Sequence, residues 1–161
     1  MGAITILDDI LERHPELIEG DRINLATTMG YTALIHASNG WPERAKRLLE
    51  LKANIHHADS NGRQALHHAC VKNAAGCVQV LLQYKADVHA ADKHGDTALH
   101  LAADGVTLAG NCNDADKLVV ISALLQARAS INARSSLGET PVDIAQQSRL
   151  DDALLMFMQE P

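Results

Sequence analysis

The sequence contains few aromatic residues and few cysteines. Only 2% of its 161 residues are Phe, Trp or Tyr, although 47% are apolar. A core built almost without aromatic rings must come from Leu, Ala, Val and Ile, a mixture that favours packed helices over sheets. The cysteines, Cys70, Cys77 and Cys112, are an odd number at spacings that match no common zinc motif. We therefore expect a mainly helical chain in a reducing compartment, the cytoplasm and alternatively the nucleus.

Positive charge is scarce as well. Lys and Arg number 14 against 20 Asp and Glu, which gives a formal net charge of −6. The longest basic cluster is the interrupted stretch ERAKR at 43–47. A surface that follows a nucleic-acid backbone needs a much longer basic stripe. We therefore expect no nucleic-acid partner.

Long hydrophobic runs are missing too. None approaches the roughly 20 residues that a membrane-spanning helix requires. Asp8 and Asp9 lie where a secretory signal would be apolar, and Ile6 lies where a myristoylation signal has Ser or Thr. We therefore expect no membrane partner.

Catalytic motifs are also absent from the sequence. It contains no glycine-rich phosphate loop, no His-Glu-x-x-His and no Gly-x-Ser-x-Gly. The acidic pair Asp151 and Asp152 is best interpreted as charge in the first turn of the last helix, where carboxylates favour the positive end of the dipole. We expect a chain that is not an enzyme and has no cofactor.

What the chain does contain is a repeat. Gly30, Gly62, Gly95 and Gly138 each begin a similar stretch, at intervals of 32, 33 and 43 residues. Each glycine is followed by a short apolar segment, which reads TALIHA, QALHHA, TALHLA or TPVDIA. A second apolar run follows, containing RLLELKANI, VLLQYKADV, ALLQARASI or LLMFM. The pattern predicts units of helix, turn, helix and loop, with a period of about 33 residues and one insertion.

These units closely resemble the ankyrin repeat, whose hallmark is a Gly-x-Thr-Pro-Leu-His-x-Ala helix start at a period of about 33 residues. The resemblance extends from Gly20 to Met158 and implies an all-α fold, a solenoid of stacked helix–turn–helix units with protruding loops or β-hairpins. We expect a single domain over 1–161, with an N-terminal cap or partial repeat at 5–26, repeats at 27–58, 59–91 and 92–134, an inter-helix insertion at about 105–116 in the third repeat, and a C-terminal capping repeat at 135–161.

The end of the second helix departs from the family pattern. Ankyrin repeats normally have a glycine there in a left-handed conformation, whereas this chain has Gly20 followed by Lys52, Lys85 and Arg128. That conformation costs a non-glycine residue about 1 kcal/mol. A basic side chain at the negative end of the helix dipole offsets part of this cost. We expect the left-handed turn to persist at a small loss of stability.

The nine histidines suggest a metal site, since His67 and Cys70 lie one helical turn apart. However, His67 and His100 occupy the histidine position of the ankyrin motif. The resemblance implies that these two bind neighbouring backbone and link adjacent turns. A metal site needs a larger convergent set of ligands, so we favour the structural role. For His36 and His68 the sequence offers no partner.

The cysteines fall at different kinds of position. Cys70 and Cys77 match positions of the ankyrin repeat that face the interior, so we expect buried thiols that act as small apolar groups. Cys112 lies in the insertion, where exposure would permit labelling or oxidation.

A further row appears in the loops. Asn24, His56, His89 and Asn132 each follow a β-branched residue. Ankyrin repeats usually have Asn at this position, where its side chain stabilises the turn. We expect that role here, with hydroxylation of Asn132 as a weaker alternative.

The function follows from the array. Stacked repeats leave a rigid concave surface of loop tips and inner helices, and the resemblance implies that this surface binds another protein as an adaptor, inhibitor or targeting subunit. Met29 and Tyr31 are the expected anchors, and Trp41 either joins them or packs over the inter-helix turn. The expected contact residues are Thr28, Met29, Tyr31, Asn39, Trp41, Ser60, Asn61, Arg63, Val71, Lys72, Lys93, His94, Asp96, Asp104, Ser136, Leu137 and Glu139.

Two alternatives stay open. One is a self-assembling scaffold, suggested by Met156 and Met158 in the apolar final stretch LDDALLMFM, although we expect a monomer. The other, less favoured, is a metal-dependent enzyme that uses His67, His68 and Cys70.

Overall fold

The structure is a computed structural model that describes residues 20–104, 114–148 and 150–151. The start of the expected N-terminal cap, most of the insertion with Cys112, and Met156 and Met158 lie outside the described residues. The described elements are the 3-10 helix η2 (Gly20–Asn24) and the α-helices α2 (Ala33–Ala37), α3 (Pro42–Glu50), α4 (Ala65–Val71), α5 (Ala75–Gln83), α6 (Ala98–Ala103), α7 (Asp114–Gln126) and α8 (Pro141–Gln147).

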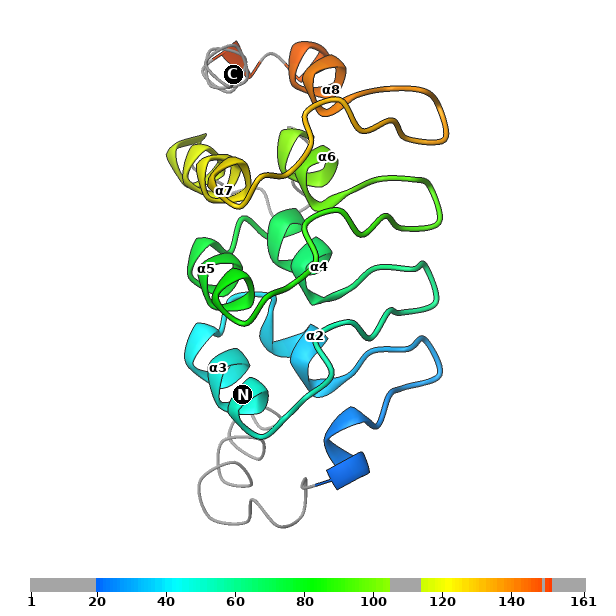
Figure 1. Ribbon diagram of the computed structural model, residues 1–161, viewed down its shortest axis with the longest axis vertical. Coiled ribbons are helices and arrows are strands. Elements are labelled where there is room, and N and C mark those ends of the chain that lie inside the picture. Colours follow the sequence, from blue (N-terminus) through cyan, green and yellow to red (C-terminus); the bar gives the residue numbers. More distant parts are fainter. Residues whose placement is uncertain (1–19, 105–113, 149, 152–161) are drawn as a thin grey trace.

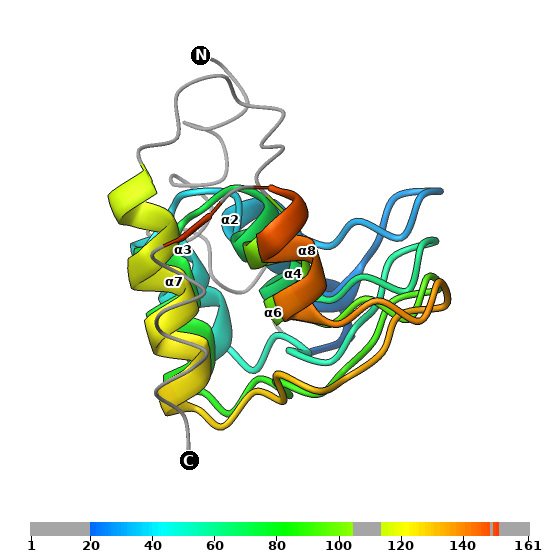
Figure 2. The same ribbon diagram turned by 90° about the horizontal axis from the view of Figure 1, so that it is seen from above.

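The helices form two parallel columns (Figure 1). The inner helices α2, α4, α6 and α8 stack in one column, and the outer helices α3, α5 and α7 stack beside it. Figure 2 shows that the loops between repeats leave the inner column on the side away from the outer helices. Within the described ranges there is no strand, only the isolated bridges Ala26–Thr32 and Ala91–Thr97. The predicted all-α solenoid is confirmed.

Each inner helix begins at an N-cap residue that follows the loop directly. Thr140 and Asp143 at the start of α8 cap each other's backbone N–H groups, at 2.8 and 3.2 Å. At α4 and α6 the N-cap N–H instead donates to a histidine ring three residues later, as from Gln64 to His67 at 3.1 Å and from Thr97 to His100 at 3.1 Å. These bonds satisfy backbone donors that a helix start leaves unpaired.

The outer helices end in left-handed residues, as predicted. Lys52, Lys85 and Arg128 have φ angles of 70°, 66° and 65°. At each helix end the next residue, an alanine, donates its N–H to a leucine carbonyl five residues back; the bond from Ala86 to Leu81 measures 3.0 Å. This is the Schellman arrangement, which satisfies the last carbonyls of a helix. The backbone keeps the turn although glycine is absent.

The core lies between the two columns and continues through all repeats. Buried leucines of the inner and outer helices belong to one core cluster, and burial of each such side chain stabilises the fold by about 2 kcal/mol. Cys70 and Cys77 are completely buried within this core, as predicted. The fully buried leucines are Leu34, Leu48, Leu66, Leu81, Leu99 and Leu124.

The loops end in four tight turns, here called the fingers, at 27–31, 59–63, 92–96 and 135–139. In each finger the first residue donates its N–H to the carbonyl of the fifth, and the fourth residue, a glycine, donates back to the first. The glycines have φ angles between 75° and 80°, a region that L-residues rarely adopt. The four motif glycines therefore occupy equivalent places in a regular row.

Neighbouring fingers touch through their backbones. Each finger accepts one N–H bond from the next: Ser60 to Met29 at 3.0 Å, Lys93 to Asn61 at 2.9 Å and Ser136 to His94 at 2.7 Å. A Cβ atom added to the first three glycines would lie 2.8 to 3.0 Å from backbone of the following finger. Glycine is required there for close approach as well as for φ.

In the described part of the chain, no helix is both long enough and apolar enough to cross a membrane.

Alanine substitutions in the last two fingers can measure how much stability is lost when this close contact is disturbed. At Gly95 a Cβ would lie 2.9 Å from the Ser136 nitrogen, whereas at Gly138 no described atom lies within 4 Å. Both φ angles are left-handed, 75° and 79°, so either alanine costs about 1 kcal/mol in backbone strain. Gly95→Ala should lose about 2 kcal/mol more, because the fingers must separate. Chemical denaturation measures this difference, and equal losses would contradict it.

Candidate functional site

The fingers expose side chains at two regular positions. The second and third residues of every finger are exposed to solvent, including Met29 at 55% and Leu137 at 85%. All eight were expected as contact residues, and each finger exposes a different pair. The exposed tip residues are Thr28, Met29, Ser60, Asn61, Lys93, His94, Ser136 and Leu137.

The residue after each glycine is half-buried. Tyr31 packs its ring against two histidine rings, with centroid distances of 5.4 Å to His36 and 5.2 Å to His68. It therefore joins the first repeat to the second while part of it remains accessible. The other residues at this position are Arg63, Asp96 and Glu139.

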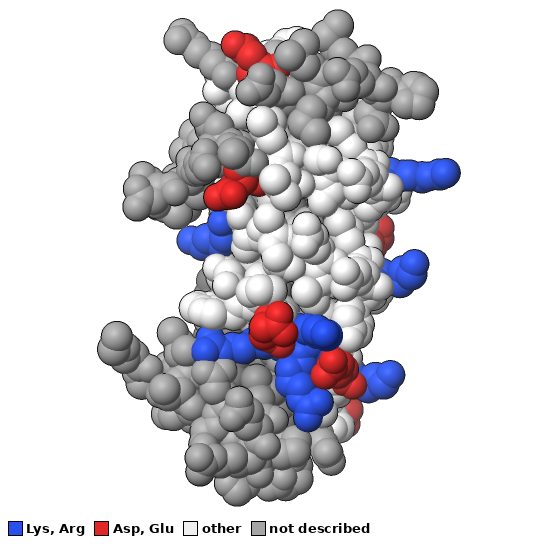
Figure 3. Space-filling model, turned by 90° about the vertical axis from the view of Figure 1, so that its left-hand side faces the viewer, with Lys and Arg blue, Asp and Glu red and all other residues white. Residues whose placement is uncertain are grey.

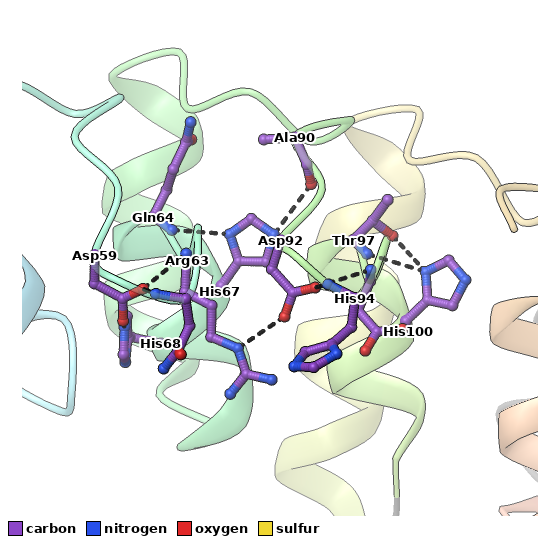
Figure 4. Close-up of polar contacts among 12 residues, drawn as sticks. Asp59, Arg63, Gln64, His67, His68, Ala90, Asp92, His94, Thr97 and His100 are labelled. Carbon is purple, nitrogen blue, oxygen red and sulfur yellow. Dashed lines mark hydrogen bonds and ion pairs between the residues drawn. The ribbon is translucent and has the colours of Figure 1, made fainter. Parts of the chain in front are cut away.

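Arg63 is engaged within the chain. Its Nε donates to Oδ2 of Asp92 in the next finger at 2.9 Å (Figure 4). The Asp92 side chain is completely buried, and that of Arg63 is 28% exposed. Arg63 was expected as a partner contact, and the structure gives its guanidinium a second role in linking two repeats.

Asp59 and Asp92 organise their fingers. One carboxylate oxygen of Asp59 accepts the N–H groups of Asn61 at 2.7 Å and Arg63 at 2.9 Å. Burial raises the pKa of Asp59, but these bonds and the His68 ring outweigh it, so that its pKa lies below the usual value. Asp92 accepts from His94 and Asp96 in the same way. The sequence reasoning missed both, although aspartate at the first position of DSNGR and DKHGD is a typical turn signal.

The histidines without a predicted partner also have structural contacts. His68 places Nε2 at 2.9 Å from Oδ2 of Asp59, and His36 lies against Tyr31. His57, which the sequence reasoning passed over, places its Nε2 at 3.0 Å from the Gly30 carbonyl of the preceding finger. The His57 bond therefore ties the loop that leads to the second finger to the backbone of the first finger.

His67 and His100 have the linking role that the resemblance implied. Because Nδ1 of each ring accepts a backbone N–H, Nε2 carries the proton and donates to a carbonyl in the next finger or in the loop that leads to it. The distances are 3.0 Å from His67 to Ala90 and 3.1 Å from His100 to Glu139. Figure 4 shows the His67 ring between the Gln64 N–H and the Ala90 carbonyl. Each ring is therefore committed at both nitrogens.

The metal hypothesis receives no support from this geometry. Among the described residues, no group of three His, Cys, Asp or Glu side chains is placed to hold a metal ion. Burial raises the pKa of the Cys70 thiol far above its usual value, so that it stays protonated. His67 has no ring nitrogen to spare.

Asn24, His56, His89 and Asn132 form the row expected to stabilise the loops. At two of these positions a different side chain stabilises the turn. The turns that contain His56 and His89 are capped by the residues two places earlier, Asn54 and Asp87, at 3.0 and 2.9 Å. Asn24 accepts the N–H of Asn54 at 2.7 Å and so connects neighbouring loops. Asn and Asp commonly cap a backbone N–H two residues ahead.

The contacts expected beyond the fingers lie at the ends of the inner helices. Val71 and Asn39 are half-buried, while Lys72 and Asp104 are exposed. Trp41 lies in the turn between α2 and α3, at the end of α2 opposite to its finger. Its ring is 39% exposed, and the Arg44 guanidinium lies 5.5 Å from the ring centroid.

A hollow opens at the C-terminal end of this surface. Its volume is about 550 Å³, and it lies between the last two fingers and the inner helices that follow them. Six of the expected contact residues line it. The lining residues are His94, Asp96, Asp104, Ser135, Ser136, Leu137, Glu139, Ile144, Gln147 and Ser148.

The opposite face, formed by the outer helices, has an uneven distribution of charge. Figure 3 shows charged side chains gathered over α3 and a largely uncharged band above it. The band corresponds to α5, whose sequence AGCVQVLLQ has no charged residue, whereas α3 reads PERAKRLLE. None of the expected contact residues lies within these outer helices.

Comparison with known proteins agrees with this geometry. A family model described as ankyrin repeats, three copies long, matches residues 10–92 and again residues 38–119. The two matches together cover more than half of the chain. A search of curated proteins finds no match.

The Arg63–Asp92 pair can be tested by a double-mutant cycle. Arg63→Met leaves a buried carboxylate without its cation and should lower the free energy of unfolding by about 2 kcal/mol. Asp92→Asn keeps an oxygen for the turn N–H groups but removes the charge, so the double variant should be no less stable than Arg63→Met. Denaturant titration of all four chains measures the coupling, and strictly additive losses would argue against it.

Acid should weaken the fold through the buried histidines. Burial lowers the pKa of His67 below 6.5 despite the nearby Asp92 charge, and burial also lowers that of His68 despite Asp59. Below pH 6.5 the unfolded chain therefore binds protons that the folded chain does not. The free energy of unfolding should fall as the pH drops from 6.5 towards the folded pKa values and then level off.

His67→Asn provides the check on this pH dependence. Asn can accept the Gln64 N–H but does not titrate, so the slope of stability against pH between 7.5 and 5.5 should become shallower. Thermal or urea unfolding at several pH values measures the slope. An unchanged slope would show that other groups cause the effect.

Proposed function

The chain belongs to the ankyrin-repeat family, and from this premise we propose that it binds a partner protein on the surface formed by the fingers and inner helices. Ankyrin repeats are generally protein-interaction modules and are typically non-catalytic. For this chain we propose a role as adaptor, inhibitor or targeting subunit. We also propose that the binding unit is a monomer, to be checked by a mass independent of concentration in light scattering.

One observation supports this proposal above the others. The backbone of the four fingers is closely similar, with φ angles of 75° to 80° at the glycines and equivalent hydrogen bonds between neighbours. Each finger nevertheless exposes a different pair of tip side chains. A uniform scaffold with varied exposed side chains is the arrangement expected for recognition, because the scaffold loses little conformational entropy on binding.

The proposed contact residues differ in how much stability is lost when they are substituted. The tip residues are exposed, so they can be replaced with little effect on stability. Tyr31 and Arg63 also hold repeats together, through ring packing and the Asp92 pair. A test of binding should therefore change the tips and leave these two residues in place.

The test is a triple variant, Met29→Ser, Asn61→Ser and Lys93→Ser, compared with the original chain in affinity capture from the native lysate followed by mass spectrometry. Binding hot spots typically lose more than 2 kcal/mol on truncation, so recovery of the partner should fall about 30-fold or more. The unfolding transition should stay nearly unchanged.

A matched control changes the outer helices instead. Lys46→Ser, Gln79→Ser and Gln83→Ser also remove one lysine and two other side chains, all exposed. This variant should capture the partner as well as the original chain does. Undiminished capture by the tip variant, or loss only in the control, would refute the proposed surface.

A further inference from the structure

The hollow at the end of the finger row has a distinctive chemistry. Asp96, Asp104 and Glu139 contribute three carboxyl groups from two fingers and the end of an inner helix. Among the described residues that line the hollow, none is Lys or Arg. A cationic group that entered this hollow would meet an excess of negative charge on the walls around it.

The hollow also has an apolar wall. Leu137 projects from the last finger with 85% of its surface exposed, and Ile144 of α8 lies half-buried nearby. Lys and Arg place their methylene stems along apolar surface while the charged group reaches polar groups. The combination of carboxylates and these two side chains suits such a residue.

A small metal ion does not suit the hollow. Among the described residues, no three carboxylate, histidine or cysteine side chains converge on one point that could hold a metal ion. The negative charge is spread over the walls. An extended cation with several N–H donors matches this spread better than a single ion does.

The preceding junction, between the second and third fingers, contains an ion pair. There, Arg63 occupies the position after the glycine and pairs with Asp92 of the next finger at 2.9 Å. In the third finger the same position holds Asp96. Burial and the Asp92 charge raise the pKa of Asp96, and they outweigh His100, Arg63 and His94, which lower it. The position that supplies a cation at one junction, Arg63, therefore supplies a carboxylate, Asp96, at the next.

We propose that the hollow between the last two fingers binds a Lys or Arg side chain of the partner protein, with its stem on Leu137 and Ile144. This assignment rests on the proposed function and specifies one feature of the partner. The carboxyl groups of Asp96 and Glu139 accept from the cation, and Asp104 adds negative charge at the rim.

The experiment uses a displayed library of random linear peptides, selected on the full chain. Selected peptides should share a Lys or Arg at one position. On the variant Asp96→Asn with Glu139→Gln, which keeps size and oxygen acceptors, their affinity should fall about tenfold or more. Replacing the shared Arg by citrulline, or Lys by acetyl-lysine, should cost as much on the original chain and little further on the variant.

The control removes two carboxylates elsewhere, by Asp21→Asn with Glu43→Gln. Both residues are exposed and neither lines the hollow, so this variant should bind the peptides normally. An equal loss of affinity in the control would show that the effect comes from net charge alone. It would overturn the proposed cation site.

The remaining outcomes separate this inference from the proposed function. Peptides that depend on Met29, Asn61 and Lys93 but share no basic residue would overturn the cation site and leave the binding surface standing. Selection that returns no peptide sensitive to either the tip variant or the hollow variant would overturn both.

Discussion

The close contact between neighbouring fingers is the constraint on which the surface depends. At Gly30, Gly62 and Gly95 a Cβ atom would lie within 3.0 Å of the backbone of the next finger. The finger spacing is therefore set by backbone against backbone, and one N–H bond per junction reproduces it along the row. Since this spacing does not depend on the tip side chains, they can vary without moving the scaffold. A surface built in this way is rigid and adaptable in sequence.

Buried polar groups also determine how neighbouring repeats are placed relative to one another. Asp59 and Asp92 hold the N–H groups of their own fingers and also reach His68 and Arg63. His67 connects its helix start to the Ala90 carbonyl, in the loop that leads to the third finger. A buried group of this kind is costly when it has no partner, so each repeat is stable only when its neighbour is correctly placed. Apolar packing alone would permit more freedom between repeats.

The charge of the binding surface depends on which charged side chains are already paired within the chain. Arg63 is committed to Asp92, so that junction is internally paired. At the next junction Asp96 stands where Arg63 stood, and Glu139 follows it in the last finger, beside the hollow. The difference between an internally paired junction and an acidic one arises from a single position of the repeat. A partner therefore meets a surface whose electrostatic character changes along its length.

The sequence alone determined the repeat, the helix pairs, the turn glycines and the left-handed helix ends, because each depends on residues close together in the chain. The resemblance to the ankyrin motif also implied that Cys70 and Cys77 are buried, because both match positions of the motif that face the interior. Only the tertiary structure revealed that Arg63 pairs with Asp92 and that His57 contacts Gly30, since these partners lie 29 and 27 residues apart. Periodicity predicts that two repeats stack, but the pairing of particular side chains depends on distances that only the stacked backbones define.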